Sequence, residues 1–300
     1  MNSTRAMQGM KQGMEQGKKS SRKLIVNADD LGFAPGRDRG ILRACDAGIV
    51  SSVSLLANGS TCAAAAAATK MRRVGVGVHL NLSEGRALSG SINGLTDAQG
   101  NFYGKHRARS VFAHAAFDPG AALRELKSQV ETVLGHGIIV DHVDYHQHMG
   151  LFPATMALVL EVCRQFGIKA ARLCAPAEPP EHDPSTILGK ELDLYRRLAA
   201  QMRMNLQHAG IRCPDGIWGM PQLNRLHEKS LCALLEQLPP GHWELMVHPG
   251  DEDPGLPFCT VERKREQEAL ISSSVREIIA RRGITLTTFG DLCAHSDLLT

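Results

Sequence analysis

Carboxylate and imidazole side chains stand at the ends of short apolar runs, where buried strands would finish. The pair Asp29 and Asp30 ends the first run, His79 ends the third, and His248 ends a late one, just before Pro249. Each has an ordinary structural interpretation, because paired aspartates can cap a helix and His-Pro-Gly is first of all a turn. A lone histidine is more often a satisfied core residue than a ligand. Their repetition at strand ends suggests a shared site.

The ladder His142, Asp144, His146, His148 is a stronger signal. On a continuous strand these four side chains share one face, because side chains alternate with period two. Four polar groups on one buried face are costly without a partner, and a metal ion is the natural one. Two histidines with one carboxylate leave coordination positions open for water and substrate. This pattern is typical of catalytic sites that bind zinc, another first-row divalent ion or, with more water ligands, magnesium.

Neighbouring residues on an extended chain point in opposite directions. Only one residue of the pair Asp29 and Asp30 is therefore expected to bind the ion, which leaves the other free to act as a base.

Elements with strand and helix character alternate along the chain and must position these residues. The apolar patterns predict strands at 24–26, 51–56, 74–82, 138–145, 170–173, 243–247 and 284–288, and helices after Pro35 and at 62–71, 119–134, 153–166, 188–208, 227–238 and 261–282. Repeated strand–helix units indicate a parallel sheet with helices outside. We predict an α/β fold, an irregular TIM-barrel-like (β/α) barrel of about seven strands, with the site at the carboxyl ends of the strands.

Two regions interrupt this alternation, and one precedes it. Residues 1–22 lack apolar periodicity and are predicted to be a disordered tail, which leaves residues 23–300 as a single barrel domain. Residues 83–116 have loop composition, and 174–219 is predicted to be an insertion with one helix. We expect both segments to cover the mouth of the site and to select the substrate.

Composition excludes several classes of protein. The 34 basic and 31 acidic side chains nearly balance, which argues against a nucleic-acid partner. No apolar run reaches the roughly 20 residues of a transmembrane segment. The eight cysteines form no CxxC pair, and with no signal peptide they predict reduced thiols in the cytoplasm. The oligomeric state stays open, with a homodimer as one option.

Four ordered motifs resemble those of the YdjC/ChbG-type carbohydrate deacetylases, a family that includes HpnK-type hopanoid-biosynthesis deacetylases. The motifs are VNADDLG at 26–32, GVHLNL at 77–82, HVDYHQH at 142–148 and MVHP at 246–249. The resemblance runs from about residue 23 to 292. It implies a barrel that uses one divalent ion, Mg²⁺ or Zn²⁺, to remove acetyl groups from N-acetylated sugars.

The resemblance also implies roles for individual residues. Asp30, His79 and His146 match the metal ligands, Asp29 matches the general base, and His248 matches a histidine that acts as general acid. It further places Arg172 where it would steady the carboxylates. The chain departs from the family pattern at Leu31, where Phe is usual, at Ser83, where Thr is common, and at Gly150, where a further histidine often stands.

Two other functions remain open at this stage. A barrel phosphoesterase would use two or three metal ions, and His142 and His148 could supply the additional ligands. A non-catalytic sugar-binding relative is the other, although only 4% of residues are aromatic and Asp29 and His248 are intact. Candidate substrates are chitooligosaccharides, a GlcNAc-bearing lipid or another acetamido sugar.

Overall fold

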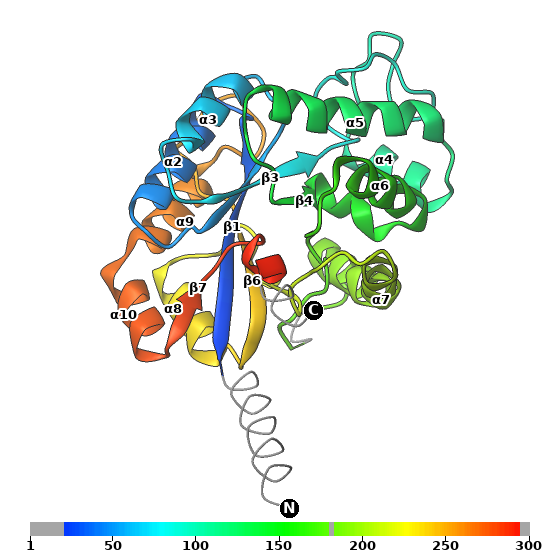
Figure 1. Ribbon diagram of the computed structural model, residues 1–300. Helices are drawn as coiled ribbons and strands as arrows, with labels where there is room; N and C mark the ends of the chain where they lie inside the picture. The colour runs from blue at the N-terminus through cyan, green and yellow to red at the C-terminus, as the bar shows by residue number, and fades with distance from the viewer. Residues whose placement is uncertain (1–20, 180–182, 295–300) are drawn as a thin grey trace, which may run out of the picture.

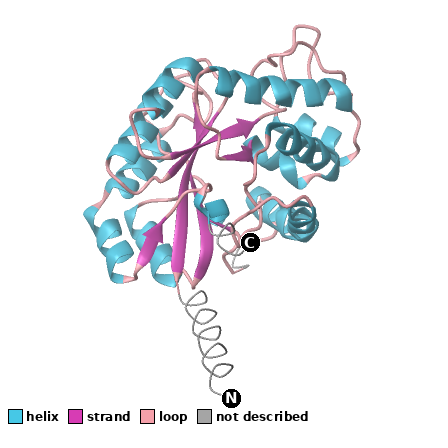
Figure 2. Ribbon diagram, in the orientation of Figure 1, coloured by secondary structure: helices cyan, strands magenta, loops and turns pink. Residues whose placement is uncertain are grey.

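A curled sheet of parallel strands forms the centre of the computed structural model, which describes residues 21–179 and 183–294 (Figures 1 and 2). Its order is β4-β3-β2-β1-β6-β5, and β7 pairs with the start of β1. The seven strands in this part of the chain are β1 (Arg22–Leu31), β2 (Ser52–Leu55), β3 (Gly75–Leu80), β4 (His142–Tyr145), β5 (Ile217–Trp218), β6 (Gly241–Val247) and β7 (Ile284–Leu286). The predicted α/β, TIM-barrel-like architecture is confirmed.

The sheet continues from β4 to β5 through residues 170–177 rather than through a regular strand. Isolated bridges join Val143 to Ala171 on one side and Pro176 to Ile217 on the other. The strand predicted at 170–173 is therefore only a bridged segment. The segment predicted to be an insertion contributes β5, which has two residues and is too short to show a periodic pattern.

Strand β1 lies in the middle of the sheet, with β2 and β6 as its neighbours, and is buried from Leu24 to Leu31. Alternate residues have different surroundings, as a strand requires. Leu24, Val26 and Ala28 belong to the large apolar core, whereas Ile25 packs in a separate small apolar cluster. Asn27 instead makes buried hydrogen bonds to the polar side chains of Ser54 on β2 and Asp144 on β4. One face of β1 thus changes from apolar to polar toward its carboxyl end.

Helices cover the outside of the sheet (Figure 2). They are α2 (Pro35–Asp46), α3 (Cys62–Thr69), α4 (Lys105–Ala113), α5 (Pro119–Gly135), α6 (Pro153–Phe166), α7 (Ile187–His208), α8 (Glu228–Gln237), α9 (Val261–Ile271), α10 (Ser273–Arg281) and α11 (Asp291–Ala294), with 3-10 turns η1 (His146–Leu151) and η2 (Met220–Gln222). Among the described residues, no helix has the length and hydropathy of a membrane span.

The sequence-based boundaries were wrong at two helices. The helix predicted at 261–282 is broken at Ser272, whose extended backbone and side chain cap the start of α10. Helix α4 lies inside the region predicted to be loop, because it buries only Ala108 and Phe112 and so has little apolar periodicity. The predicted tail at 1–22 falls outside the described residues up to position 20, and Arg22 already belongs to β1.

Glu178, near the start of the segment predicted to be an insertion, is bonded to the residue that follows β5 and should make the stability of the fold depend on pH. One carboxylate oxygen accepts the N–H of Gly219, and the other is buried without a hydrogen-bond partner in the described structure. Burial raises the pKa of Glu178 from 4.5 to about 7. The folded state therefore holds this proton more tightly than the unfolded state does, so the free energy of unfolding falls as pH rises from about 4.5 to 7.

Glu178→Gln should remove this loss of stability. The variant should match the wild type at pH 4, below both pKa values, and exceed it at pH 8, by up to about 3 kcal/mol at roughly 1.4 kcal/mol per pKa unit. Urea unfolding of both proteins at the two pH values measures the difference. Equal stability at pH 8 would show that Glu178 ionises without cost.

Candidate active site

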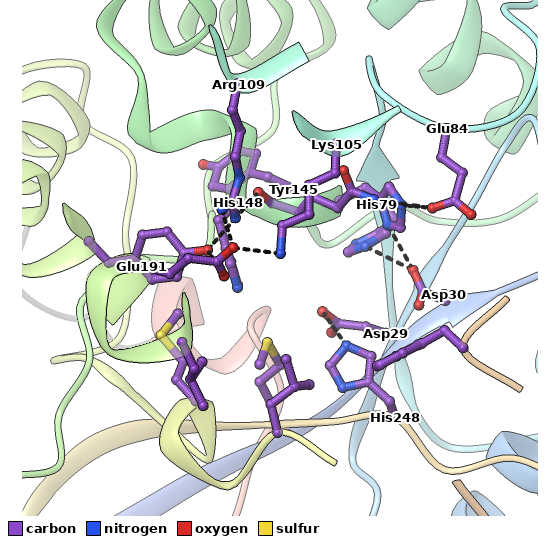
Figure 3. A pocket seen from close by; sticks show the side chains of 18 of the residues that line it. Asp29, Asp30, His79, Glu84, Lys105, Arg109, Tyr145, His148, Glu191 and His248 are labelled. Carbon is purple, nitrogen blue, oxygen red and sulfur yellow. Dashed lines mark hydrogen bonds and ion pairs between the residues drawn. The ribbon is translucent and has the colours of Figure 1, made fainter. Parts of the chain in front are cut away.

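Three of the sequence-predicted residues converge at the carboxyl ends of β1, β3 and β4, and Figure 3 labels two of them, Asp30 and His79. Oδ1 of Asp30 lies 2.9 Å from Nδ1 of His146 and 3.3 Å from Nε2 of His79. All three side chains are buried, and one ligand atom from each lies within 4.8 Å of the others. The structure therefore brings together the carboxylate and two imidazoles that the strand-end motifs indicated.

The backbone turns sharply at Asp30. Its φ of +66° is left-handed, which is rare for a residue other than glycine, and the pairing of β1 with β2 shifts register between Ala28 and Leu31. The alternation argument used for the two aspartates fails here, because the chain is no longer extended. Asp29 and Asp30 both line the same pocket, although they have different partners.

A carboxylate stands behind His79. Nδ1 of His79 lies 2.8 Å from Oδ1 of Asp144, which is fully buried. Burial alone would lower the pKa of His79, but Asp144 and Asp30 raise it to about 10. Burial likewise opposes ionisation of Asp30, whereas the two histidines and Arg37 hold its pKa well below the usual range. The Asp30 carboxylate and the two imidazoles thus stabilise one another's charged forms.

Arg172 organises the other carboxylates, as the resemblance implied. Its guanidinium group is fully buried and makes two hydrogen bonds to Asp29, of 2.6 and 2.7 Å. It also contacts Glu244 at 2.6 Å and Asp144 at 3.1 Å. Burial raises the pKa of Glu244 to about 7, despite the opposing effect of Arg172. Asp29 is consequently fixed in orientation by Arg172 and has no histidine in direct hydrogen-bond contact.

The charge of this cluster fits a divalent cation. Four buried carboxyl groups, at Asp29, Asp30, Asp144 and Glu244, stand against the two buried guanidinium groups of Arg37 and Arg172. With all four carboxylates ionised and the imidazoles neutral, as metal ligands must be, the cluster carries two net negative charges, which without a cation are offset by protons held on His79 and Glu244. The donor set of one carboxylate and two imidazoles is also the one that zinc and similar ions prefer.

His248 reaches the same pocket from the end of β6. Its backbone N–H donates to Glu266 at 2.7 Å, and its ring meets Phe258 edge-on at 5.3 Å. Nε2 lies 3.9 Å from Oδ2 of Asp29. Burial lowers the pKa of His248 to about 4, which the nearby aspartates only partly offset. The imidazole is therefore neutral at pH 7 in this arrangement.

These side chains open into a cavity of about 290 Å³ with two unlike walls. The apolar wall consists of Leu188, Leu192, Met220, Leu223, Met246, Pro257 and Phe258. The polar wall includes Lys105 and Arg109 from α4, both paired with Glu191 of α7 at 2.8 and 2.6 Å (Figure 3). Both segments that were expected to cover the mouth thus contribute residues to the pocket.

The histidine ladder is not a ladder in the structure. Strand β4 ends at Tyr145, and Gln147 and His148 adopt left-handed conformations in η1. His142 lies outside the pocket lining, where it contacts Asp141 and stacks on Phe289 at 4.0 Å. His148 lines the pocket but packs against Tyr195. Within the described residues, neither belongs to a potential metal-binding group.

Several residues of the site escaped sequence analysis. Arg37 contacts Asp30 at 2.9 Å, Glu84 contacts His146 at 2.8 Å, and Glu244 shares Arg172 with Asp29. Lys105 and Arg109 lie four residues apart, which places both on one side of α4, but the helix itself was not predicted. A charged residue inside an apolar strand, such as Glu244 in WELMV, was the one available signal.

Comparison with known proteins defines the class. The model of the family described as YdjC-like protein matches residues 23–281. A mouse carbohydrate deacetylase is 32% identical, covering 90% of this chain and 94% of its own length. A carbohydrate deacetylase of Clostridium beijerinckii is 27% identical, covering 90% of this chain and 100% of its own length.

The fold is also found among solved structures. One from Enterococcus faecalis, provisionally assigned to cellobiose-phosphate cleavage, superimposes with a TM-score of 0.70 at 23% identity, covering 91% of this chain and 99% of its own. At that identity the likeness concerns the fold. The chain belongs to the YdjC-like family, and the prediction of an enzyme of this family is confirmed.

Proposed function

We propose that the protein is a metal-dependent hydrolase that removes the acetyl group from an N-acetylated sugar. The observation that carries the proposal is the convergence of Asp30, His79 and His146 on one side of a pocket, with Asp29 and His248 facing the same space. The names of the mouse and bacterial relatives support the deacetylase class. Asp30, His79 and His146 would hold one divalent ion, Mg²⁺ or Zn²⁺.

The cation would supply two things, polarisation of the amide carbonyl and a water molecule that loses its proton near neutral pH. The side chains divide the remaining work. Asp29, held by Arg172, accepts the proton of the attacking water, because its carboxylate faces the pocket and is not paired with a triad histidine. His248 delivers a proton to the departing amine nitrogen, which otherwise leaves poorly.

The neutral state of His248 determines where its proton must come from. With a pKa of about 4, the imidazole is not protonated to imidazolium at pH 7, so it acts as an acid only after it has taken up a proton during the reaction. Asp29 lies 3.9 Å away and has just received a proton from water. We infer that the proton passes from Asp29 to His248 and then to the amine, so that both groups end each turnover unchanged.

The structure bears on the alternatives. A phosphoesterase with several metal ions would need additional ligands, yet His142 lies outside the pocket lining and His148 belongs to no potential metal group within the described chain. A second possible group, Asp29, His79 and Asp144, shares His79 with the first, and both of its carboxylates already contact Arg172. A non-catalytic relative would not need the buried Asp29–Arg172 pair or His248 beside it. Chitooligosaccharides and a GlcNAc-bearing lipid both stay candidate substrates. A cytoplasmic location fits the buried thiols of Cys62, Cys163, Cys174 and Cys259, which form no disulfide bonds.

Acetate release decides the proposal. The metal-loaded protein should release acetate from at least one member of a panel of N-acetylated sugars, including chitooligosaccharides and a GlcNAc lipid. Chelation should abolish the release, and added Zn²⁺ or Mg²⁺ should restore it. His146→Ala should lose stoichiometric metal and activity together. Phosphate release from sugar phosphates without acetate release would favour the phosphoesterase instead.

A further inference from the structure

Each histidine of the metal triad has a carboxylate on its far side. For His79 this is Asp144, as described above, with Nε2 directed at Asp30. For His146 it is Glu84, whose Oε2 lies 2.8 Å from Nε2, while Nδ1 of the same ring lies 2.9 Å from Asp30. The two imidazoles therefore converge on Asp30, and each is contacted from behind by a carboxylate.

We propose that Glu84 is a positioning residue for the metal, which holds the ring of His146 with Nδ1 toward the ion. A carboxylate that accepts the N–H at Nε2 fixes the tautomer in which Nδ1 carries the lone pair. The compact ligand groups among the described residues join His146 to Asp30 and His79 but do not include Glu84. The inference rests on the metal site of the proposed function, but on neither its substrate nor its reaction.

The turn that carries Glu84 is held by buried amides. Oδ1 of Asn81 accepts the N–H of Ser83 at 2.9 Å and of Glu84 at 3.1 Å, and its Nδ2 donates to the Glu84 carbonyl at 2.7 Å. Asn58 donates to the same carbonyl at 3.0 Å. Asn81 is fully buried and exchanges two hydrogen bonds with Gln129. This network leaves the backbone of Glu84 little freedom.

The side chain of Glu84 is oriented as well. Nε2 of Gln147 donates to Oε2 at 3.2 Å, and Gln147 adopts a left-handed φ of +52°. Such a conformation is unfavourable for a residue other than glycine, so the surrounding contacts must hold Gln147 in place. The Glu84 side chain keeps 30% of its exposure, whereas Asp144 has none. The Glu84 side chain can therefore be replaced without leaving a fully buried polar group that has no hydrogen-bond partner.

Metal affinity tests the role directly. Zn²⁺ and Co²⁺ are titrated calorimetrically into the chelator-stripped full-length protein. Glu84→Ala should weaken metal binding about 10–100-fold, the usual effect of removing such a partner. Glu84→Gln should lose less than about tenfold, because its amide oxygen still accepts from Nε2 of His146. The Co²⁺ absorption spectrum of Glu84→Gln should keep the wild-type shape, since the ligands are unchanged.

Glu191→Gln is the matched control. Glu191 is a partly buried glutamate that lines the same pocket but contacts Lys105 and Arg109 rather than a histidine. Its removal takes one negative charge from the pocket and should leave metal affinity within about threefold. Circular dichroism and melting temperature confirm that each variant is folded.

Two results overturn the proposal. If Glu84→Ala weakens metal binding no more than Glu191→Gln does, Glu84 acts only through its charge. If Glu84→Gln loses as much affinity as His146→Ala and changes the Co²⁺ spectrum, Glu84 is a ligand. Neither measurement involves a sugar, so a failure to release acetate would be separate from either result.

Discussion

Asp29→Asn is expected to lose roughly 10²-fold or more in kcat and to keep its metal. The substitution preserves the shape of the side chain and one hydrogen-bonding oxygen, but removes the basicity needed to accept a proton from water. Metal should remain, because the proposed ligands are Asp30, His79 and His146, whereas both carboxylate oxygens of Asp29 are held by Arg172 at 2.6 and 2.7 Å. Asp29 also belongs to a second possible ligand group with His79 and Asp144, and the metal content of the variant distinguishes the two groups. Metal content and acetate release are measured on the same purified protein.

His248→Ala separates the acid from the base. This variant should also keep its metal and lose turnover, but it should lose less with a substrate whose leaving group needs no proton. Asp29→Asn should be slow with both kinds of substrate, because the attacking water is the same. Normal turnover in Asp29→Asn would exclude it as the base, and loss of metal would make Asp29 a ligand.

Arg172→Met is expected to cost about 3–5 kcal/mol of folding stability, the range for breaking a buried ion pair. Arg172 is the shared partner of Asp29, Asp144 and Glu244, so its removal leaves carboxylates without compensation at the centre of the sheet. Urea unfolding at pH 7 measures the loss.

The pH dependence of this loss identifies its cause. The abandoned carboxyl groups should take up protons in the folded variant, which raises their pKa and makes the deficit smaller at pH 5 than at pH 8. Arg164→Met is the control, because Arg164 contacts Glu161 at 2.6 Å on an exposed surface and should change stability little. A deficit that does not vary with pH would mean that lost packing, rather than charge, is responsible.

The order of the strand-end motifs was enough to predict the fold class and most of the candidate site residues from the sequence alone. Asp29, Asp30, His79 and His248 each follow an apolar run that becomes a parallel strand, and parallel strands place their carboxyl ends at one edge. That geometric rule brings distant residues together without knowledge of side-chain packing. The same reasoning predicted the α/β class and the part that segments 83–116 and 174–219 take in the pocket.

Only the tertiary structure showed which residues of the 142–148 motif belong to the site. The histidine ladder was interpreted as one strand face, but β4 ends at Tyr145, so His146 enters the triad while His148 turns to Tyr195. Nothing in the local pattern marks that end, because the residues on both sides are polar and aromatic alike.

The residues that contact the triad from behind could not be predicted from the sequence either. Glu84 and Arg37 contact His146 and Asp30 across separations of 62 and 7 residues, one from a loop and one from a helix. The left-handed turn at Asp30 directs both aspartates into one pocket, against the alternation of an extended chain. Strand ends follow from local periodicity, whereas charge compensation in a buried cluster depends on contacts that form only when the whole sheet has curled.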